Sequence, residues 1–185
     1  LEECRALMKS YRERAGDDAL IEFCGGEPTV RQDILQLSRA ARDLGFDYIQ
    51  LNTNGIRLAE SPDFCRELRS AGVTTVYMGF DALTDKPYMA KYGRSLLDTK
   101  KKAVENCARA GLAVVLVVCV IPGENDGELG DIVRYAAANM PTVKGVYLQP
   151  ISYFGIYPKD DIRRMTIPDV IRRLESQHQD ISARD

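Results

Sequence analysis

Apolar residues gather in five short runs along the chain, and these runs begin near residues 19, 46, 73, 112 and 145. Each gap between them holds a stretch in which apolar positions recur every three or four residues, which is the spacing of an amphipathic helix. Strands that alternate with helices in this way are typical of parallel sheets with right-handed crossovers. The pattern therefore predicts an α/β fold built from βα repeats over residues 19–158.

The apolar runs predict strands over residues 19–24, 46–51, 73–80, 112–120 and 146–149. The run over 112–120 is the strongest signal, because it holds nine apolar residues in succession and five of them are valine. A strand without polar positions is typical of a parallel sheet that is covered on both faces. We therefore expect residues 112–120 to be buried on both sides.

Helix signals fill the gaps between the strands. Thr29 and Gln32 have the spacing of a capping box, so we expect a helix from Val30 to a glycine stop at Gly45. The other expected helices cover residues 1–15, 62–71, 95–110, 125–139 and 166–178.

Two of these helices have their own start signals. Ser61 followed by Pro62 predicts an N-cap and a first helical residue. Asn125 and Glu128 have capping-box spacing, as Thr29 and Gln32 do.

Glycines and polar residues follow the expected strands directly. In a parallel sheet these positions converge on one edge, where α/β proteins place their sites. The strand-end residues are Gly25, Gly26, Glu27, Thr53, Asn54, Asp81, Ile121, Pro122, Gly123 and Gln149. Carboxylates, amides, bare backbone and an apolar ledge suit a ligand that has an amine, hydroxyls and a flat ring. No nucleophile elbow, phosphate loop or dinucleotide-binding glycine motif accompanies them.

The composition is that of one globular domain. The 185 residues are 45% hydrophobic and 28% charged, which is sufficient for a single core. A net charge of -2 gives no electrostatic reason to bind nucleic acid or an anionic membrane. No apolar run approaches the roughly 20 residues that cross a bilayer. We expect the basic run at residues 100–102 to lie on a solvated helix face.

The five cysteines lack the short spacing of zinc or iron-sulfur loops, since they lie at positions 4, 24, 65, 107 and 119. An odd number of cysteines favours a reducing, cytoplasmic compartment. Cys65, Cys107 and Cys119 fall on apolar positions, so we expect small core residues there. Cys24 adjoins the glycines, and we expect it to pack as well.

Several strand ends together resemble the radical S-adenosylmethionine (SAM) enzymes. Cys-Gly-Gly-Glu-Pro-Thr at residues 24–29 is similar to the Gly-Gly-Glu-Pro motif of that family. Asn-Thr-Asn-Gly at 52–55, Phe-Asp at 80–81, Val-Ile-Pro-Gly-Glu-Asn-Asp at 120–126 and Gln-Pro at 149–150 follow in the family's order. The resemblance implies a partial (β/α)6-type, TIM-like barrel that lacks its first strand.

The resemblance also implies roles in SAM binding. The assignments are Gly25, Gly26 and Glu27 for the amino group, Thr53, Asn54 and Asp81 for the carboxylate and ribose, and Ile121, Pro122, Gly123 and Gln149 for the adenine side. A carboxylate beside bare backbone suits an ammonium group independently of the family. The structural alternatives are a tight βα turn for the two glycines and a helix-dipole partner for the acid.

One family feature is missing. The family's [4Fe-4S] cluster is held by CxxxCxxC after a first strand, and this sequence contains no CxxxCxxC. We therefore expect the chain to be part of a longer enzyme and to be inactive alone. In that parent, SAM would be cleaved reductively to a 5′-deoxyadenosyl radical, which removes a hydrogen atom from a small-molecule substrate.

The resemblance implies further partners for the parent. An electron donor such as ferredoxin or flavodoxin would reduce the cluster. Without the first strand, residues 19–24 would present a free edge at which copies of the chain can pair.

Residues 93–106, 122–126 and 166–170 look most like the subfamily of pterin methylases and tetraether lipid synthases. Two other functions stay open. One is a module that binds a nucleoside or an amino acid without chemistry, which the missing cysteines favour. The other is an ordinary barrel lyase or aldolase, which usually has a lysine at a strand end, whereas none of the expected strands ends in lysine.

Overall fold

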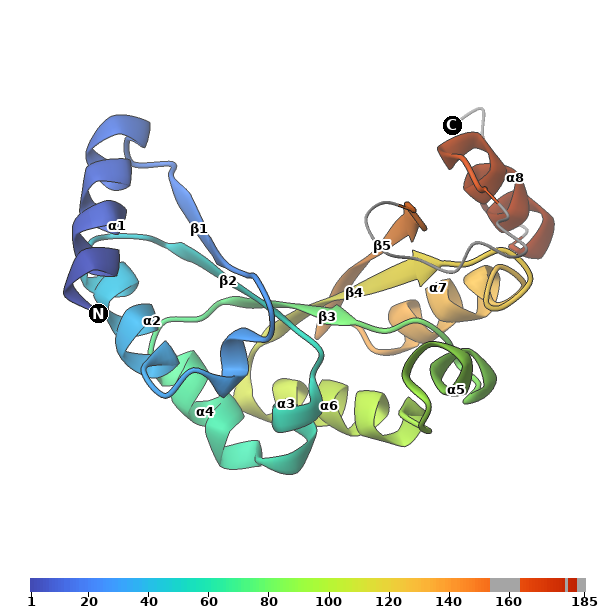
Figure 1. The fold of residues 1–185 in the computed structure, drawn as a ribbon, viewed down its shortest axis with the longest axis horizontal. Coiled ribbons are helices and arrows are strands. Elements are labelled where there is room, and N and C mark those ends of the chain that lie inside the picture. The colour runs from blue at the N-terminus through green and yellow to red at the C-terminus, as the bar shows by residue number, and fades with distance from the viewer. Residues whose placement is uncertain (154–163, 179, 183–185) are drawn as a thin grey trace.

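The computed structural model describes residues 1–153, 164–178 and 180–182. Five parallel strands form one sheet in the order β1-β2-β3-β4-β5. They are β1 (Leu20–Phe23), β2 (Tyr48–Thr53), β3 (Thr75–Gly79), β4 (Ala113–Val120) and β5 (Val143–Pro150). The predicted parallel α/β sheet is confirmed, as an open, curved sheet whose described strands do not close into a barrel (Figure 1). Residues 154–158, the end of the predicted repeats, lie outside the described residues.

The helices lie mainly on the convex side of this sheet. They are α1 (Glu2–Ala15), α2 (Ile34–Asp43), α3 (Ile56–Glu60), α4 (Pro62–Ser70), α5 (Lys86–Tyr92), α6 (Leu97–Ala110), α7 (Leu129–Ala138) and α8 (Ile167–Gln177), with a 3-10 turn at Pro28–Val30. Figure 1 shows α2, α4, α6 and α7 beneath the strands, while α1 and α8 stand at opposite ends of the sheet. Between α1 and α8, the described part of the chain places no helix over the concave face.

The two faces of β4 differ in burial. Val114, Leu116, Val118 and Val120 are buried against the convex helices, while the residues between them are half-buried on the concave side. Such alternation is typical of a strand that is covered on one face. The prediction that 112–120 is buried on both faces is therefore wrong, because the described helices cover only one side.

The helix predicted from Val30 begins later than its capping signal indicated. The backbone N–H of Thr29 donates to the Glu27 carboxylate at the start of the 3-10 turn, and α2 starts only at Ile34. The capping box predicted for Thr29 and Gln32 is wrong, because Thr29 is a donor to Glu27 here and caps no helix.

Asn125 does not cap α7 either. Its Oδ1 accepts from the Ile121 N–H at 2.7 Å, and its Nδ2 donates to the carbonyl oxygens of Asp81 and Cys119, both at 2.8 Å. Glu128 occupies the N-cap position without a capping bond and binds the loop after β3 instead. The predicted capping box is therefore wrong, since both side chains connect strand-end loops.

Other local predictions are confirmed. Ser61 caps α4 by accepting from the Phe64 N–H at 3.1 Å, and Gly111 ends α6 with a φ of +72°. The sequence pattern missed the short helices α3 and α5. It also ended the second strand too early, because β2 continues through Asn52 to Thr53.

Gly55 connects the end of β2 to α3 and has a φ of +77°. A Cβ at Gly55 would lie 2.5 Å from the sulfur of the buried Met78. We expect Gly55→Ala to lower the free energy of unfolding by roughly 1–3 kcal/mol, because backbone strain and the core clash add. Urea denaturation measures this loss. Gly127→Ala is the matched control, since a Cβ at Gly127 meets nothing within 4 Å, and equal losses in both variants would contradict the prediction.

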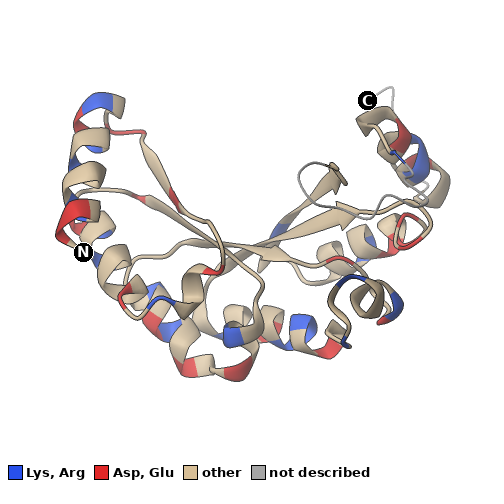
Figure 2. Ribbon diagram, in the orientation of Figure 1, with Lys and Arg blue, Asp and Glu red and all other residues tan. Residues whose placement is uncertain are grey.

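Charged side chains are concentrated on the helices, and the strands are almost free of them (Figure 2). Within the five described strands the charged residues are Glu22 on β1 and Lys144 on β5. In the described ranges, no helix has the length and apolar character needed to cross a membrane.

Candidate functional site

The carboxylate of Glu27 is the centre of the strand-end cluster. Its Oε1 accepts from the hydroxyls of Thr29 and Thr53, both at 2.6 Å, and from the Thr29 N–H at 3.1 Å. Its Oε2 accepts from the backbone N–H of Asn54 at 2.6 Å. A carboxylate oxygen has two lone pairs, so Oε2 retains an acceptor position. Glu27 thus joins the ends of β1 and β2 and keeps one lone pair for a ligand.

Glu27 is ionised at neutral pH. Burial is the largest single influence and opposes ionisation, but the hydrogen bonds from Asn54, Thr29 and Thr53 together outweigh it and lower the pKa of Glu27 below its ordinary value. A charged carboxylate with a free lone pair is a strong acceptor for a cationic amine.

The loop before Glu27 exposes its backbone. Gly25 and Gly26 have φ values of +91° and +54°, and a Cβ at either position would meet no atom within 4 Å. Only glycine adopts such conformations without strain. A hollow of about 320 Å³ lies here, lined by Cys24, Gly25, Gly26, Glu27, Asn52, Thr53, Asn54, Tyr77, Gly79 and Val117. Five predicted site residues, those at 25–27 and 53–54, therefore lie together.

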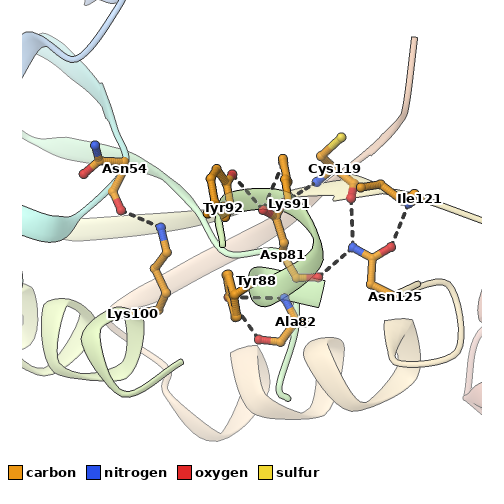
Figure 3. A network of polar contacts seen from close by, with 10 residues as sticks. All are labelled: Asn54, Asp81, Ala82, Tyr88, Lys91, Tyr92, Lys100, Cys119, Ile121 and Asn125. Carbon is orange, nitrogen blue, oxygen red and sulfur yellow. Dashed lines mark hydrogen bonds and ion pairs between the residues drawn. The ribbon is translucent and has the colours of Figure 1, made fainter. Parts of the chain in front are cut away.

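Asp81 lies apart from this hollow, in the polar network of Figure 3. Its Oδ2 accepts from Lys91 Nζ and the Tyr92 hydroxyl, both at 3.0 Å, and its Oδ1 accepts from the Cys119 N–H at 3.0 Å. Burial is the largest single influence on Lys91 and disfavours its charge, but attraction from Asp81 and the hydrogen bonds of Lys91 with Tyr92 and Asp81 together outweigh burial and raise the pKa of Lys91. Asp81 is 3% exposed, so it connects the ends of β3 and β4 to α5 from within the protein.

The predicted adenine segment turns beyond the end of β4. The amides at the two ends of Ile121–Gly123 donate to the side chains of Asn125 and Asp126 at 2.7 and 2.9 Å. Gln149 is exposed on β5, opposite Cys119 in the register. Neither the segment nor Gln149 lines the hollow at the glycine loop.

Lys100 is a buried residue of this region that the sequence pattern assigned to solvent. Its side chain is 2% exposed, and its Nζ donates to the carbonyl oxygen of Asn54 at 2.5 Å (Figure 3). The prediction of a solvated face over 100–102 is wrong for Lys100, because α6 places it between the buried Leu96 and Ala103. Burial lowers the pKa of Lys100 to about 8. The signal for this burial is the helical spacing of Lys100 from the apolar Leu96 and Ala103.

The cysteines divide between core and site. Cys65 and Cys107 are fully buried, as predicted, and Cys119 is half-buried. The prediction that Cys24 packs is wrong, since Cys24 is exposed at the rim of the hollow. Within residues 1–153, 164–178 and 180–182, no three His, Cys, Asp or Glu side chains are grouped to hold a metal ion.

An open parallel sheet with a glycine-acid loop at the carboxyl end of β1 defines a partial TIM-type barrel with a ligand-binding edge. The profile of the Radical SAM superfamily matches residues 1–136. The chain belongs to the radical SAM superfamily, as the strand-end motifs predicted, and enzymes of this family use SAM and a [4Fe-4S] cluster for radical chemistry.

Two curated relatives are similar over much of this chain. It is 41% identical over 179 residues to 7,8-dihydro-6-hydroxymethylpterin dimethyltransferase from Methanocaldococcus jannaschii, covering 95% of this chain and 35% of the relative. It is 34% identical over 116 residues to a probable GTP 3′,8-cyclase from Pyrococcus abyssi, covering 63% of this chain and 37% of the relative. The chain thus spans about a third of the length of these relatives.

A solved structure shares the fold. The radical SAM methyltransferase TsrM from Kitasatospora setae, with cobalamin and a [4Fe-4S] cluster bound, matches with a TM-score of 0.54 at 16% identity. The match covers 76% of this chain and 27% of TsrM.

The residues present fit one of the two family cofactors. Bare glycine backbone beside the ionised Glu27 suits the amino-acid end of SAM. The cluster does not fit this chain, because the sequence has no CxxxCxxC and the described residues contain no metal-binding group.

Proposed function

We propose that the chain is the SAM-binding part of a radical SAM enzyme and that the methionine end of SAM binds in the hollow at Glu27. The observation that carries this proposal is Glu27 Oε2, an ionised carboxylate oxygen that accepts one hydrogen bond in the described structure. Next to it lies the open backbone of Gly25 and Gly26. In this proposal the amino group of SAM donates to Oε2.

The neighbouring residues take complementary roles in the proposal. The Thr53 hydroxyl already donates to Glu27 and accepts from the Gly55 N–H, so Thr53 orients the acid. The Asn54 side-chain Oδ1 accepts from the Ile56 N–H, which leaves its Nδ2 to donate to the carboxylate of SAM. When bound, SAM supplies the radical chemistry, and these residues bind it and fix its orientation.

The remaining predicted residues belong to the far side of the proposed cofactor site. Ile121, Pro122, Gly123 and Gln149 are proposed for the adenine side, since the first three follow β4 and Gln149 lies near the carboxyl end of β5. Asp81 is proposed as a positioning residue, because both of its carboxylate oxygens are engaged inside the protein.

We propose that the substrate contains a 2-amino-4-oxopyrimidine ring. The names of the relatives from Methanocaldococcus jannaschii and Pyrococcus abyssi refer to a pterin and to GTP. Both molecules contain this ring, although the two named reactions differ. The ring that the two molecules share supports a substrate of this chain that is recognised through the same ring.

For the parent enzyme we propose a longer polypeptide, of which this chain is one domain, with ferredoxin or flavodoxin as electron donor. The share of its relatives that the chain covers supports this proposal. The free cysteines support a cytoplasmic location. The outer edge of β1 has no partner strand among the described residues, which supports edge pairing between copies of the isolated chain.

Calorimetric titration of the chain with SAM and with adenosine tests the cofactor proposal. We expect SAM to bind at least about 10-fold more tightly, because a hydrogen bond to a charged group contributes roughly 1.5–3 kcal/mol. Equal affinities would favour the nucleoside-binding module instead. In the parent, reconstituted with iron and sulfide, failure to form 5′-deoxyadenosine despite SAM binding would contradict the radical function.

A further inference from the structure

A row of polar side chains crosses the concave face beside the Glu27 hollow. Asn52 Nδ2 donates to Glu22 Oε1 at 2.5 Å, and Gln50 Nε2 donates to Asn52 Oδ1 at 2.8 Å. The Tyr48 hydroxyl lies 3.5 Å from Gln50 Oε1. We call Glu22, Asn52, Gln50 and Tyr48 the concave polar row.

The strand register explains why these residues share a face. Glu22 pairs with Gln50 across β1 and β2, and Asn52 pairs with Tyr77 across β2 and β3. Successive side chains of a strand point to opposite faces, and the intervening Ile49 and Leu51 are fully buried. The row therefore faces away from the helices. Asn52 and Tyr77 also line the hollow, so the row continues directly from the proposed cofactor site.

Glu22 gives the row a negative charge with unused acceptors. It is the only acidic residue in the five described strands, and it is exposed. Oε1 accepts from Asn52, which leaves one lone pair on Oε1 and both on Oε2. Such a carboxylate accepts two parallel N–H bonds. The negative charge of Glu22 also repels a phosphate group.

The surroundings of the row suit a flat ring. Burial, followed by charge repulsion that includes the nearby Glu22 carboxylate, raises the pKa of Tyr77, so its hydroxyl is neutral. Beside Tyr77, Val117 and the bare backbone of Gly79 form an apolar part of the hollow. Apolar walls with a few directed polar groups are typical of small-molecule sites.

We propose that the concave polar row is the substrate-recognition site and that Glu22 binds the N–H edge of a 2-amino-4-oxopyrimidine ring. The ring N–H and the exocyclic amine donate to the two oxygens of Glu22. Asn52 and Gln50 hold the carboxylate in place, since they form a continuous hydrogen-bonded row with it. This inference rests on the proposed substrate class and adds the residues that select it.

Fluorescence titration of the chain, with SAM present, tests the inference. The probes are 6-hydroxymethylpterin and 6-hydroxymethyllumazine, which carries an oxo group in place of the 2-amino group. We expect the pterin to bind roughly 10- to 100-fold more tightly, because the lumazine removes a donor that a charged acceptor requires. In Glu22→Gln the preference for the pterin over the lumazine should fall to about 2-fold, since a carboxamide offers one acceptor and one donor.

Two comparisons make the test decisive. Glu67→Gln, at an exposed position of α4, should keep the wild-type preference. SAM affinity should be unchanged in Glu22→Gln, and circular dichroism should show that the variant is folded. Guanosine in place of the pterin distinguishes the two sources of the ring, and tight binding of either one supports the inference.

The outcomes separate this inference from the cofactor proposal. If SAM binds but neither pterin nor guanosine does, or if Glu22→Gln keeps the wild-type preference, the recognition site is overturned. If the ring binds with the expected preference but SAM does not, the cofactor proposal fails and the polar row stands.

Discussion

Glu27→Ala is expected to abolish SAM binding and to destabilise the chain. The substitution removes the acceptor for the Thr29 N–H and for the hydroxyl of Thr53, and it releases the Asn54 N–H from the end of β2. Buried donors without a partner cost about 1–3 kcal/mol each, so we expect the free energy of unfolding to fall by about 2–4 kcal/mol. SAM affinity should fall by at least about 100-fold with the loss of the charged acceptor. Urea denaturation and calorimetry measure the two effects.

Glu27→Gln separates the effect of the carboxylate on SAM binding from its effect on the stability of the fold. The carboxamide oxygen can keep the bonds that Oε1 accepts, so the stability loss should be smaller than in Glu27→Ala. The charge is lost, however, so SAM affinity should still fall by about 10-fold or more. Wild-type SAM affinity in either variant would contradict the assignment, and Glu22→Gln provides an acid-to-amide control on the strand that precedes the loop.

The stability contribution of Glu27 should also depend on pH. Its pKa in the folded chain is lowered from the ordinary value of 4.5. The unfolded chain therefore binds the proton more readily as the pH falls. The stability difference between wild type and Glu27→Gln should be fully present above pH 4.5 and shrink during acidification below it. A difference that does not change between neutral and acidic pH would contradict this.

Lys100→Met is expected to remove a pH dependence from the stability of the chain. Burial lowers the pKa of Lys100 from 10.5 to about 8 in the folded state. Between these values the unfolded chain binds more protons, so wild-type stability rises with pH. The cost of the buried ammonium is fully present below about pH 8 and is relieved toward pH 10.5. The shift corresponds to about 3 kcal/mol, and it is absent in the variant.

Urea denaturation at several pH values between 8 and 10.5 measures this slope. Lys102→Met is the matched control, because Lys102 lies on the exposed face of the same helix and its removal should leave the slope unchanged. Lys100→Met should also weaken SAM binding by roughly 10-fold, since the Asn54 carbonyl loses its donor. A wild-type slope in Lys100→Met would contradict the burial of a charge at this position.

The fold was predictable because local signals and topology agree. Apolar runs bounded by glycines mark the five strands, and parallel strands bring their carboxyl ends to one edge. The grouping of Gly25, Gly26 and Glu27 with Thr53 and Asn54 follows from that geometry alone. The same reasoning could not show that Asp81 is enclosed by Lys91 and Tyr92, because the path of the loop and helix after β3 decides this.

Side-chain direction was the main source of error. The basic run at residues 100–102 predicts a solvated Lys100, whereas its spacing from Leu96 and Ala103 indicates the buried face of the helix. On β2, Gln50 and Asn52 alternate with Ile49 and Leu51, which is the pattern of a strand with one polar and one apolar face. That alternation was the available signal for the concave polar row, and the strand boundary placed at residue 51 concealed it.

The pleat of β1 gives its residues separate tasks. Ile21 and Phe23 pack against the helices, Glu22 faces the other way, and the glycine loop begins only after the strand ends. A substitution at residue 22 therefore changes an exposed side chain that points away from the core. With the proposed assignments, residues in the body of the strand could change during evolution to select another substrate, while the residues that bind the cofactor stay in the loop at its end.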